Sequence, residues 1–538
     1  MRRAAALFIF AILLIPSAHF AWQNRQMPQF AYLHDDGILF VTAKSVATDS
    51  YRIASLPDTA YQTKFPPLFP WYLSVIWRLN PTFPDNLRLA SLFSWLSLAA
   101  YLALAWAWYG QSGVTEVRAW LLVALLAVNP YVIWFGTSLF SDVFFTCWLL
   151  ATVLVASRGG VRMALIAGLL GGCAYLSRTA GIALLVSVPA WMAWKKEWRR
   201  AAVFIAAMSP AVIGWMLWTR THMAHTSDWV TIYYTDYIRY LLHNGIRDVP
   251  LILWKNVDQL LYAMGSMAMP RIYDSLPLKI LTQVTAVAMI SGTVRLVRRG
   301  FGLPYACFAL VTAAILLVCN FPSTERYVVP VYPLLLAGLL AEIEHVAGMF
   351  KTAFRHRDFS QRAAAAIFAS GVAAILIGSL ALQFFMSFVF LQASVDESRV
   401  KLRDRKAAYG WIAEHLPASA TILSYDDPLL YLYTGRHGVH RPLDPLWWYR
   451  EDHASIQSAY RDLPAFCRSR GLEYVYFTAT DLAREAGGDD QREVQRMIRE
   501  SAELSPVFTA GIGTVYKVGP PVPAGSRDPV RSLTVAVQ

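Results

Sequence analysis

The chain has 538 residues, of which 56% are hydrophobic and only 16% are charged. A soluble globule of this size could not cover its surface with so few charges, so the composition excludes an ordinary soluble protein and indicates a polytopic membrane protein. The formal net charge is +12, from 48 lysines and arginines against 36 aspartates and glutamates. Much of this excess lies in short loops between apolar runs, which indicates membrane topology and not a nucleic-acid partner.

The first apolar run follows Arg2 and Arg3 and extends to about Trp22. Residues 17–21 lack a small-x-small cleavage pattern, which favours an uncleaved first span over a signal peptide. Further apolar runs follow, each near the ~20 residues that cross the hydrocarbon of a bilayer. They lie at about 88–109, 118–135, 139–156, 163–177, 180–194, 201–219, 279–296, 302–320, 327–347 and 363–392.

Basic residues occur in alternate loops between these runs. They are found at Arg118 and in the stretches 158–162, 195–200, 295–299 and 351–362. The positive-inside rule makes that side cytoplasmic. We therefore expect a helical bundle of about eleven transmembrane helices in the cytoplasmic (inner) membrane, with the polar C-terminal region on the extracytoplasmic, or periplasmic, side.

Residues 163–194 allow two interpretations. One tilted helix would be about 48 Å long at 1.5 Å per residue and would carry Arg178 in mid-membrane. Two short helices would return both basic ends to the cytoplasm and place Arg178 at an outer turn. The basic clusters at both ends favour the pair of helices.

Three outer segments are too long to serve only as connectors. They are 23–87, 220–277 and the region from residue 393 onward. We expect a membrane domain over 1–392, an extracytoplasmic α/β domain over 393–519, and a flexible tail over 520–538, which is rich in Pro, Gly and Ser.

Within these outer segments, residues 67–77 are too short to span a membrane and are expected to lie at its interface. The C-terminal region alternates helix with strand, which predicts a small open sheet. The predicted helices are 403–415, 453–470 and 491–504, and the predicted strands are 421–425, 474–477 and two short pieces within 506–518.

The first outer segment carries an acidic pair, Asp35 and Asp36, and then Lys64. Adjacent carboxylates just outside a span are costly unless they have a use. They also push each other's pKa apart, so that one can remain a base. The alternatives are a solvated Asp-Gly turn and a lysine that snorkels to lipid headgroups.

Further candidates gather on the same outer face. Asp142 begins a span, where a helix N-cap is the alternative. Arg178 and Arg326 run against the positive-inside bias, so each needs an anionic partner. Arg326 stands between Glu325 and Tyr327, where a local ion pair is the alternative. The convergence of acids and cations suits a substrate with an anionic headgroup and a lipid tail.

Several of these segments, by their order and sidedness, also carry a resemblance to a known family. They are Asp35-Asp36, Lys64 to Pro67, Phe140 to Asp142, Gly168 to Gly172 with Leu176 to Arg178, Glu325 to Tyr327 with Pro330, Trp411 to Pro417, and Tyr433 to Arg436. Together they resemble the GT-C superfamily of polyprenyl-phosphate-dependent glycosyltransferases. The nearest in appearance are the protein O-mannosyltransferases and the aminoarabinose transferases that act on lipid A.

The resemblance implies transfer of a sugar, with inversion, from a polyprenyl-phosphate-linked donor to an acceptor hydroxyl on a lipid, glycan or protein. It implies that Asp35 is the general base and that Asp36 orients the acceptor or assists a metal. Relatives often have Asp-Glu at this pair, which leaves open which aspartate is the base and whether a divalent cation lies nearby. The implied substrate-binding residues are Lys64, Asp142, Arg178, Arg326 and Tyr327.

Two other classes of function compete with a transferase. A flippase or transporter of a lipid-linked sugar would bind the phosphate with the same charges, but transporters often have internal repeats and spans interrupted at midplane. The sequence shows no convincing internal repeat, and the candidate charges lie at the outer boundary. A sensor or scaffold would leave the carboxylates of the first outer segment and Lys64 without a role.

Overall fold

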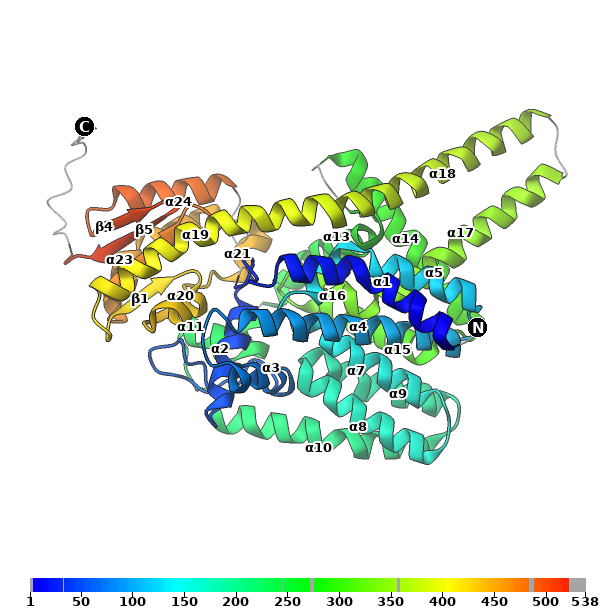
Figure 1. The fold of residues 1–538 in the computed structure, drawn as a ribbon, viewed down its shortest axis with the longest axis horizontal. Coiled ribbons are helices and arrows are strands. Elements are labelled where there is room, and N and C mark those ends of the chain that lie inside the picture. The colour runs from blue at the N-terminus through cyan, green and yellow to red at the C-terminus, as the bar shows by residue number, and fades with distance from the viewer. Residues whose placement is uncertain are drawn as a thin grey trace. The chain divides into compact units, whose positions relative to one another are not determined.

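The computed structural model is mostly helical and divides into two compact units (Figure 1). The membrane unit comprises Met1–Ala54 and Asp58–Leu402, and the C-terminal unit comprises Ser55–Pro57 and Arg403–Gln538. The structure describes residues 3–31, 33–243, 245–270, 275–355, 359–482 and 488–521. Nearly all of the predicted tail, from residue 522 on, lies outside the described residues.

Each apolar run predicted from the sequence lies in a helix or in consecutive helices of the membrane unit. These are α1 (Arg3–Gln23), α4 (Leu87–Gln111), α5 (Glu116–Ala127), α6 (Pro130–Gly136), α7 (Ser141–Ala156), α8 (Val161–Ser177), α9 (Ala183–Trp194), α10 (Trp198–His222), α14 (Leu276–Arg298), α15 (Leu303–Val318), α16 (Glu325–Val328), α17 (Tyr332–Arg355) and α18 (Phe359–Phe385). The outer segments add α2 (Asp35–Ala47), α3 (Leu68–Leu79), α11 (Trp229–Thr235), α12 (Tyr237–Leu241) and α13 (Val249–Ala268).

Fewer helices than the predicted eleven are long enough to cross a membrane. Within the described residues, 6 helices are long and apolar enough to cross a membrane, or 7 if α5 and α6, bent by 67°, form one broken span. Four other apolar helices have only 10–17 residues. A polytopic membrane bundle is therefore confirmed, whereas the predicted count of about eleven is not.

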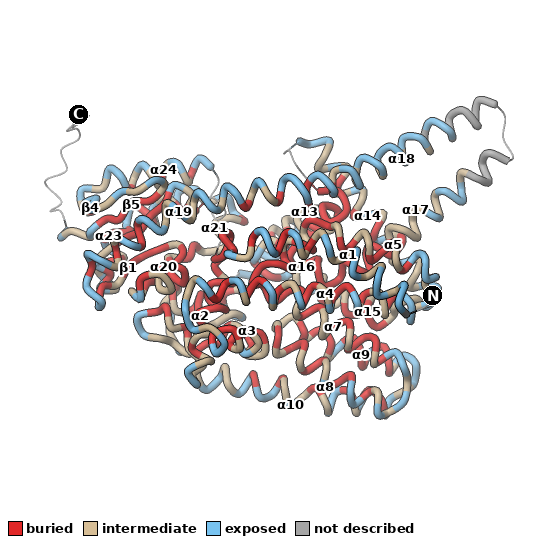
Figure 2. The backbone as a smooth tube through the Cα atoms, viewed as in Figure 1, coloured by how far each residue is buried: buried red, intermediate tan, exposed pale blue. Residues whose placement is uncertain are grey.

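The outer faces of the long helices are apolar. Ile213, Met216 and Leu217 of α10 and Val284 and Val287 of α14 are each more than half exposed. Figure 2 shows the buried positions concentrated along α4, α7 and α16, with exposed positions along α10 and α18. Exposed apolar side chains on long helices are suited to contact with lipid, because their exposure to water would be unfavourable.

Residues 163–194 form two helices, as the charge pattern predicted. The 3₁₀ turn η1 (Thr179–Ile182) separates α8 from α9. A Cβ on Gly181 would lie 2.6 Å from the Tyr175 backbone, so only glycine allows the chain to fold back this closely. The glycine-rich half of α8 packs on α10, where a Cβ on Gly168 would lie 2.6 Å from the carbonyl oxygen of Phe204.

The C-terminal unit is built on a five-stranded sheet in the order β2-β1-β3-β5-β4. Its parallel part pairs β1 with β2 and β3, and β5 runs antiparallel to β3 and β4. The predicted small open sheet is confirmed. The strands are β1 (Thr421–Ser424), β2 (His437–Val439), β3 (Tyr474–Thr478), β4 (Leu504–Ala510) and β5 (Gly513–Val518).

The helices of the C-terminal region differ in part from the prediction. The helix α19 (Leu391–His415) begins well before residue 403. The predicted helix 453–470 is divided at Asp462, two residues before Pro464, whose ring nitrogen cannot donate to the hydrogen-bond ladder of a preceding helix. The strand β2 was not predicted. The remaining helices are α20 (Asp427–Thr434), α21 (Pro445–Arg450), α22 (His453–Arg461), α23 (Leu463–Ser469) and α24 (Gly488–Glu500).

Candidate active site

The acidic pair of the first outer segment begins the helix α2, so the alternative of a solvated Asp-Gly turn is wrong. The helix is mostly buried and packs on α3, where Trp77 Nε1 donates a hydrogen bond to the Phe40 carbonyl oxygen at 3.1 Å. Asp35 and Asp36 occupy its first turn, where the helix dipole favours negative charge. The chain enters this turn through His34, whose φ of 64° lies in the left-handed region.

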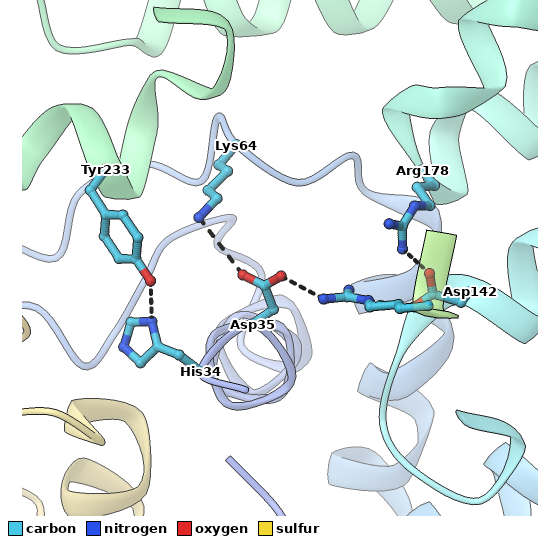
Figure 3. A network of polar contacts seen from close by, with 7 residues as sticks. His34, Asp35, Lys64, Asp142, Arg178 and Tyr233 are labelled. Atoms are coloured by element: carbon cyan, nitrogen blue, oxygen red, sulfur yellow. Dashed lines mark hydrogen bonds and ion pairs between the residues drawn. The ribbon is translucent and has the colours of Figure 1, made fainter. Parts of the chain in front are cut away.

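Five charged side chains form one continuous row of alternating sign. Lys64 Nζ lies 3.7 Å from Asp35 Oδ1, and Arg326 Nη1 lies 2.8 Å from Asp35 Oδ2. Arg326 Nε then contacts Asp142 Oδ2 at 2.7 Å, and Arg178 pairs with Asp142 Oδ1. Figure 3 shows Lys64 directed at Asp35 and Arg178 directed at Asp142. We call these five residues the charge row.

The charge row is largely withdrawn from solvent. The side chain of Asp142 is 0% exposed and that of Lys64 is 5% exposed, whereas Asp35 retains 24%. Three cations against two carboxylates leave a net charge of +1 before any ligand binds. A buried row with surplus positive charge and one accessible carboxylate can receive an anionic group such as a phosphate.

Asp142 is not a helix N-cap, and Arg326 does not form a local ion pair with Glu325. Asp142 does not cap its helix, because the N-cap position of α7 is Phe140. Arg326 pairs across the structure with Asp35 and Asp142, while the neighbouring Glu325 accepts a hydrogen bond from Ser266 Oγ at 2.8 Å. The two carboxylates and the two arginines therefore form ion pairs between parts of the chain that are distant in sequence.

Lys64 is held by its own loop instead of snorkelling to the surface. The Gln62 side-chain oxygen accepts hydrogen bonds from the backbone N–H groups of Lys64 and Phe65, each at 3.0 Å. Thr63 Oγ1 donates to the carbonyl oxygen of Thr235 at 2.7 Å. These bonds fix the backbone on both sides of the lysine, so its side chain points into the protein.

The pKa values of the two adjacent aspartates are shifted in opposite directions. Burial alone would raise the pKa of Asp35, but the charges of Lys64 and Arg326 hold that pKa below its usual value. Burial raises the pKa of Asp36 to about 7. The Asp36 side chain is 2% exposed, and its carboxylate accepts the backbone N–H of Ala31 at 2.9 Å. Asp36 makes no ion pair within the described part of the chain and lies outside the charge row.

The second outer segment supplies aromatic residues that the sequence did not single out. Tyr233 of α11 places its hydroxyl 2.8 Å from His34 Nδ1, and its ring centroid lies 4.3 Å from Lys64 Nζ. Burial raises the pKa of Tyr237 in α12 to about 12. The run of tyrosines at 233–240, in a segment too long to be a connector, was the available signal in the sequence.

Tyr327 borders the far end of the charge row. The Arg178 guanidinium lies 5.2 Å from the centre of the Tyr327 ring, and this ring shields one face of the guanidinium from water. The predicted site residues therefore come together, with Asp36 beside the row and the other six in it or in contact with it.

The described residues of the site do not form a set of ligands for a divalent cation. No group of three or more His, Cys, Asp or Glu side chains could hold a metal ion among the described residues. The two carboxylates of the charge row are already neutralised by Lys64, Arg178 and Arg326. Within the described residues, the charge row therefore offers a divalent cation no carboxylate that is free of a cationic partner.

The fold of this chain is similar to that of a solved structure with the GT-C fold, which is the fold that the resemblance in sequence predicted. The chain is similar to the crystal structure of ArnT from Cupriavidus metallidurans bound to undecaprenyl phosphate, with 14% identity and a TM-score of 0.50 over 97% of this chain and 100% of that one. At this identity the likeness concerns the fold.

Two further solved structures have TM-scores of 0.49. The apo state of ArnT from Cupriavidus metallidurans is 15% identical over 96% of this chain and 100% of that one. The archaeal oligosaccharyltransferase AglB from Archaeoglobus fulgidus, in complex with an inhibitory peptide and a dolichol-phosphate, is 11% identical over 94% and 74%. No protein-family model and no curated protein matches the sequence.

Proposed function

We propose that the protein is a membrane glycosyltransferase that moves a sugar from a polyprenyl-phosphate donor to an acceptor hydroxyl at the outer face of the cytoplasmic membrane. The observation that carries this proposal is the charge row, in which Asp35 is a partly exposed carboxylate between Lys64 and Arg326. The row offers a base and several cations within one small volume, as displacement of a phosphate requires.

In the proposed reaction the acceptor oxygen attacks the anomeric carbon. The bond from that carbon to the phosphate oxygen breaks, and the phosphate leaves with the electron pair. The acceptor proton passes to Asp35, and the configuration at the anomeric carbon inverts. Lys64, Arg178 and Arg326 stabilise the charge that grows on the leaving phosphate, so they act more strongly on the transition state than on the ground state.

Asp35 is a better candidate for the base than Asp36. At neutral pH Asp35 is ionised, because Lys64 and Arg326 lower its pKa. A bound phosphate would share these cations with Asp35 and thereby raise its basicity when the acceptor arrives. Asp36 is nearly fully buried, and its pKa of about 7 leaves a large part of it protonated at neutral pH.

A groove in the membrane unit suits the polyprenyl tail. Its volume is about 680 Å³, and its lining includes Trp71, Trp215 and Trp218. Trp218 Nε1 donates to the Gln62 carbonyl oxygen at 3.0 Å, so this wall continues into the segment that carries Lys64. We assign the tail to this groove because its tryptophan-rich wall is hydrogen-bonded to the segment that carries Lys64.

The test uses purified protein with radiolabelled polyprenyl-phosphate sugars extracted from membranes. We expect release of free polyprenyl phosphate by the wild type and strong loss of turnover in Lys64→Ala. The matched control is Asp58→Asn, an exposed charge in the same outer segment, which should retain wild-type turnover. An intact donor that moves across the bilayer of reconstituted vesicles would instead show a flippase and reject the transferase.

A further inference from the structure

The short helix α11 is tied to the segment that carries Lys64. Asp228 caps its N-terminus by accepting the backbone N–H of Thr231 at 2.9 Å. At the other end the carbonyl oxygen of Thr235 accepts a hydrogen bond from Thr63 Oγ1 at 2.7 Å. Tyr233, between these two anchors, is only 9% exposed. The helix therefore holds this tyrosine in one place relative to the candidate site.

The ring of Tyr233 covers the ammonium group of Lys64. The ring centroid lies 4.3 Å from Lys64 Nζ, with the rings of Phe65 at 5.2 Å and Tyr240 at 5.8 Å. Asp35 Oδ1 is 3.7 Å from the same nitrogen, beyond hydrogen-bond distance. Aromatic faces attract a cation without consuming its N–H donors in strong hydrogen bonds. The ammonium is thus located and still able to donate to an incoming phosphate.

The hydroxyl of Tyr233 contacts His34, the residue that directly precedes Asp35 of the charge row. It lies 2.8 Å from His34 Nδ1, and the two rings stack with centroids 5.6 Å apart. His34 directly precedes Asp35 and has a φ of 64°, a conformation that persists only where the surroundings hold it. Figure 3 shows Tyr233 directed at His34 on the side of Asp35 that faces Lys64.

We propose that Tyr233 is the positioning residue of the transfer reaction: its ring places the Lys64 ammonium for the donor phosphate, and its hydroxyl, through His34, places the carboxylate of Asp35. This inference rests on the function proposed above. It assigns to the second outer segment a task in binding the donor and orienting the base. The two parts of one side chain thus act on two different kinetic parameters.

Two variants separate these parts. Tyr233→Phe keeps the ring and removes the hydroxyl, so the KM for the donor should stay within about twofold while kcat falls about threefold to tenfold. Tyr233→Leu removes both, so the KM should also rise about tenfold. The control is Tyr72→Phe on α3, which loses a hydroxyl bond to the Phe93 carbonyl oxygen at 2.9 Å outside the site and should match the wild type.

A second readout does not depend on turnover. Affinity for polyprenyl phosphate should fall about tenfold in Tyr233→Leu and stay near wild type in Tyr233→Phe. Equal affinity in all three proteins, or an equal loss in Tyr233→Phe and Tyr233→Leu, would overturn the proposal. If the wild type binds polyprenyl phosphate but transfers no sugar from any donor, the proposed function fails while this measurement still decides the role of the ring.

Discussion

Asp35 and Asp36 are neighbours in the sequence with different surroundings in the fold. Asp35 faces Lys64 and Arg326, which favour its ionised form, whereas Asp36 points back at the Ala31 backbone and is nearly fully buried. The sequence predicted that an acidic pair would split its pKa values, but not in which direction. The direction depends on the burial of Asp36 and on the charges of Lys64 and Arg326 beside Asp35. Arg326 lies 291 positions away from Asp35 in the sequence.

The raised pKa of Asp36 predicts that the stability of the folded protein decreases as the pH rises. The folded-state pKa is about 7 against an ordinary value of 3.8, so the folded protein holds a proton that the unfolded chain loses between these values. The stability contributed by that proton is fully present below pH 3.8 and is lost as pH rises through about 7. Asp36→Asn should therefore gain thermal stability relative to the wild type from pH 5 to pH 8.

Melting temperatures of both proteins in detergent, measured across that range, test this. The exposed carboxylate variant Asp58→Asn serves as the control, since its difference from the wild type should not change with pH. A constant difference between Asp36→Asn and the wild type would mean that the Asp36 carboxyl is not held protonated by its burial.

At the scale of elements, the turn between α8 and α9 and the packing of α8 on α10 place Arg178 at the end of the charge row. Gly168 allows this packing, because a Cβ there would lie 2.6 Å from both the Phe204 carbonyl oxygen and the Cβ of Ala207. Neither contact is the far end of a flexible side chain. The two helices must therefore separate if residue 168 has a side chain.

Gly168→Ala should therefore lower thermal stability and weaken activity together, since α8 leads directly to Arg178. The matched control is Gly110→Ala at an exposed helical position with nothing within 4 Å of the added Cβ, where alanine should be neutral or slightly stabilising by up to about 1 kcal/mol. Equal melting temperatures for the two variants would contradict the close approach of α8 and α10.

The sequence predicted some elements well and others not at all. The apolar runs were found because a membrane helix must satisfy its backbone internally and expose apolar side chains. The helix α2 was missed because it is buried on nearly every face and shows little periodicity. The strand β2, of three residues, depends on pairing with β1 and has no sequence signal of its own. The aromatic contribution of α11 depends on tertiary contacts with His34 and Lys64.

At the scale of the whole molecule, the long helices with apolar outer faces indicate a protein that resides in a membrane, and the alternating loop charge predicts its orientation. The candidate residues of the first outer segment and of the outer helix ends meet in the charge row. The loop charges therefore predict that the whole charge row lies at the extracytoplasmic boundary.

Single cysteines in a cysteine-free background test this orientation. Asp58→Cys, in the first outer segment, should react with a membrane-impermeant maleimide in intact cells. Arg299→Cys, in a loop predicted to be cytoplasmic, should react only after the membrane is permeabilised. Residues 58 and 299 are both exposed. Labelling of Arg299→Cys in intact cells would reverse the topology and place the charge row on the cytoplasmic side.

The proposed sugar transfer depends on Asp35 as its base, with the cations Lys64 and Arg326 beside it. The most direct measurement is single-turnover release of polyprenyl phosphate by the wild type, Asp35→Asn and Asp36→Asn, with donor affinity measured in parallel. We predict a loss of about 10²–10⁴-fold in rate for Asp35→Asn with donor binding retained, and a much smaller loss for Asp36→Asn. Wild-type turnover in Asp35→Asn would contradict the account.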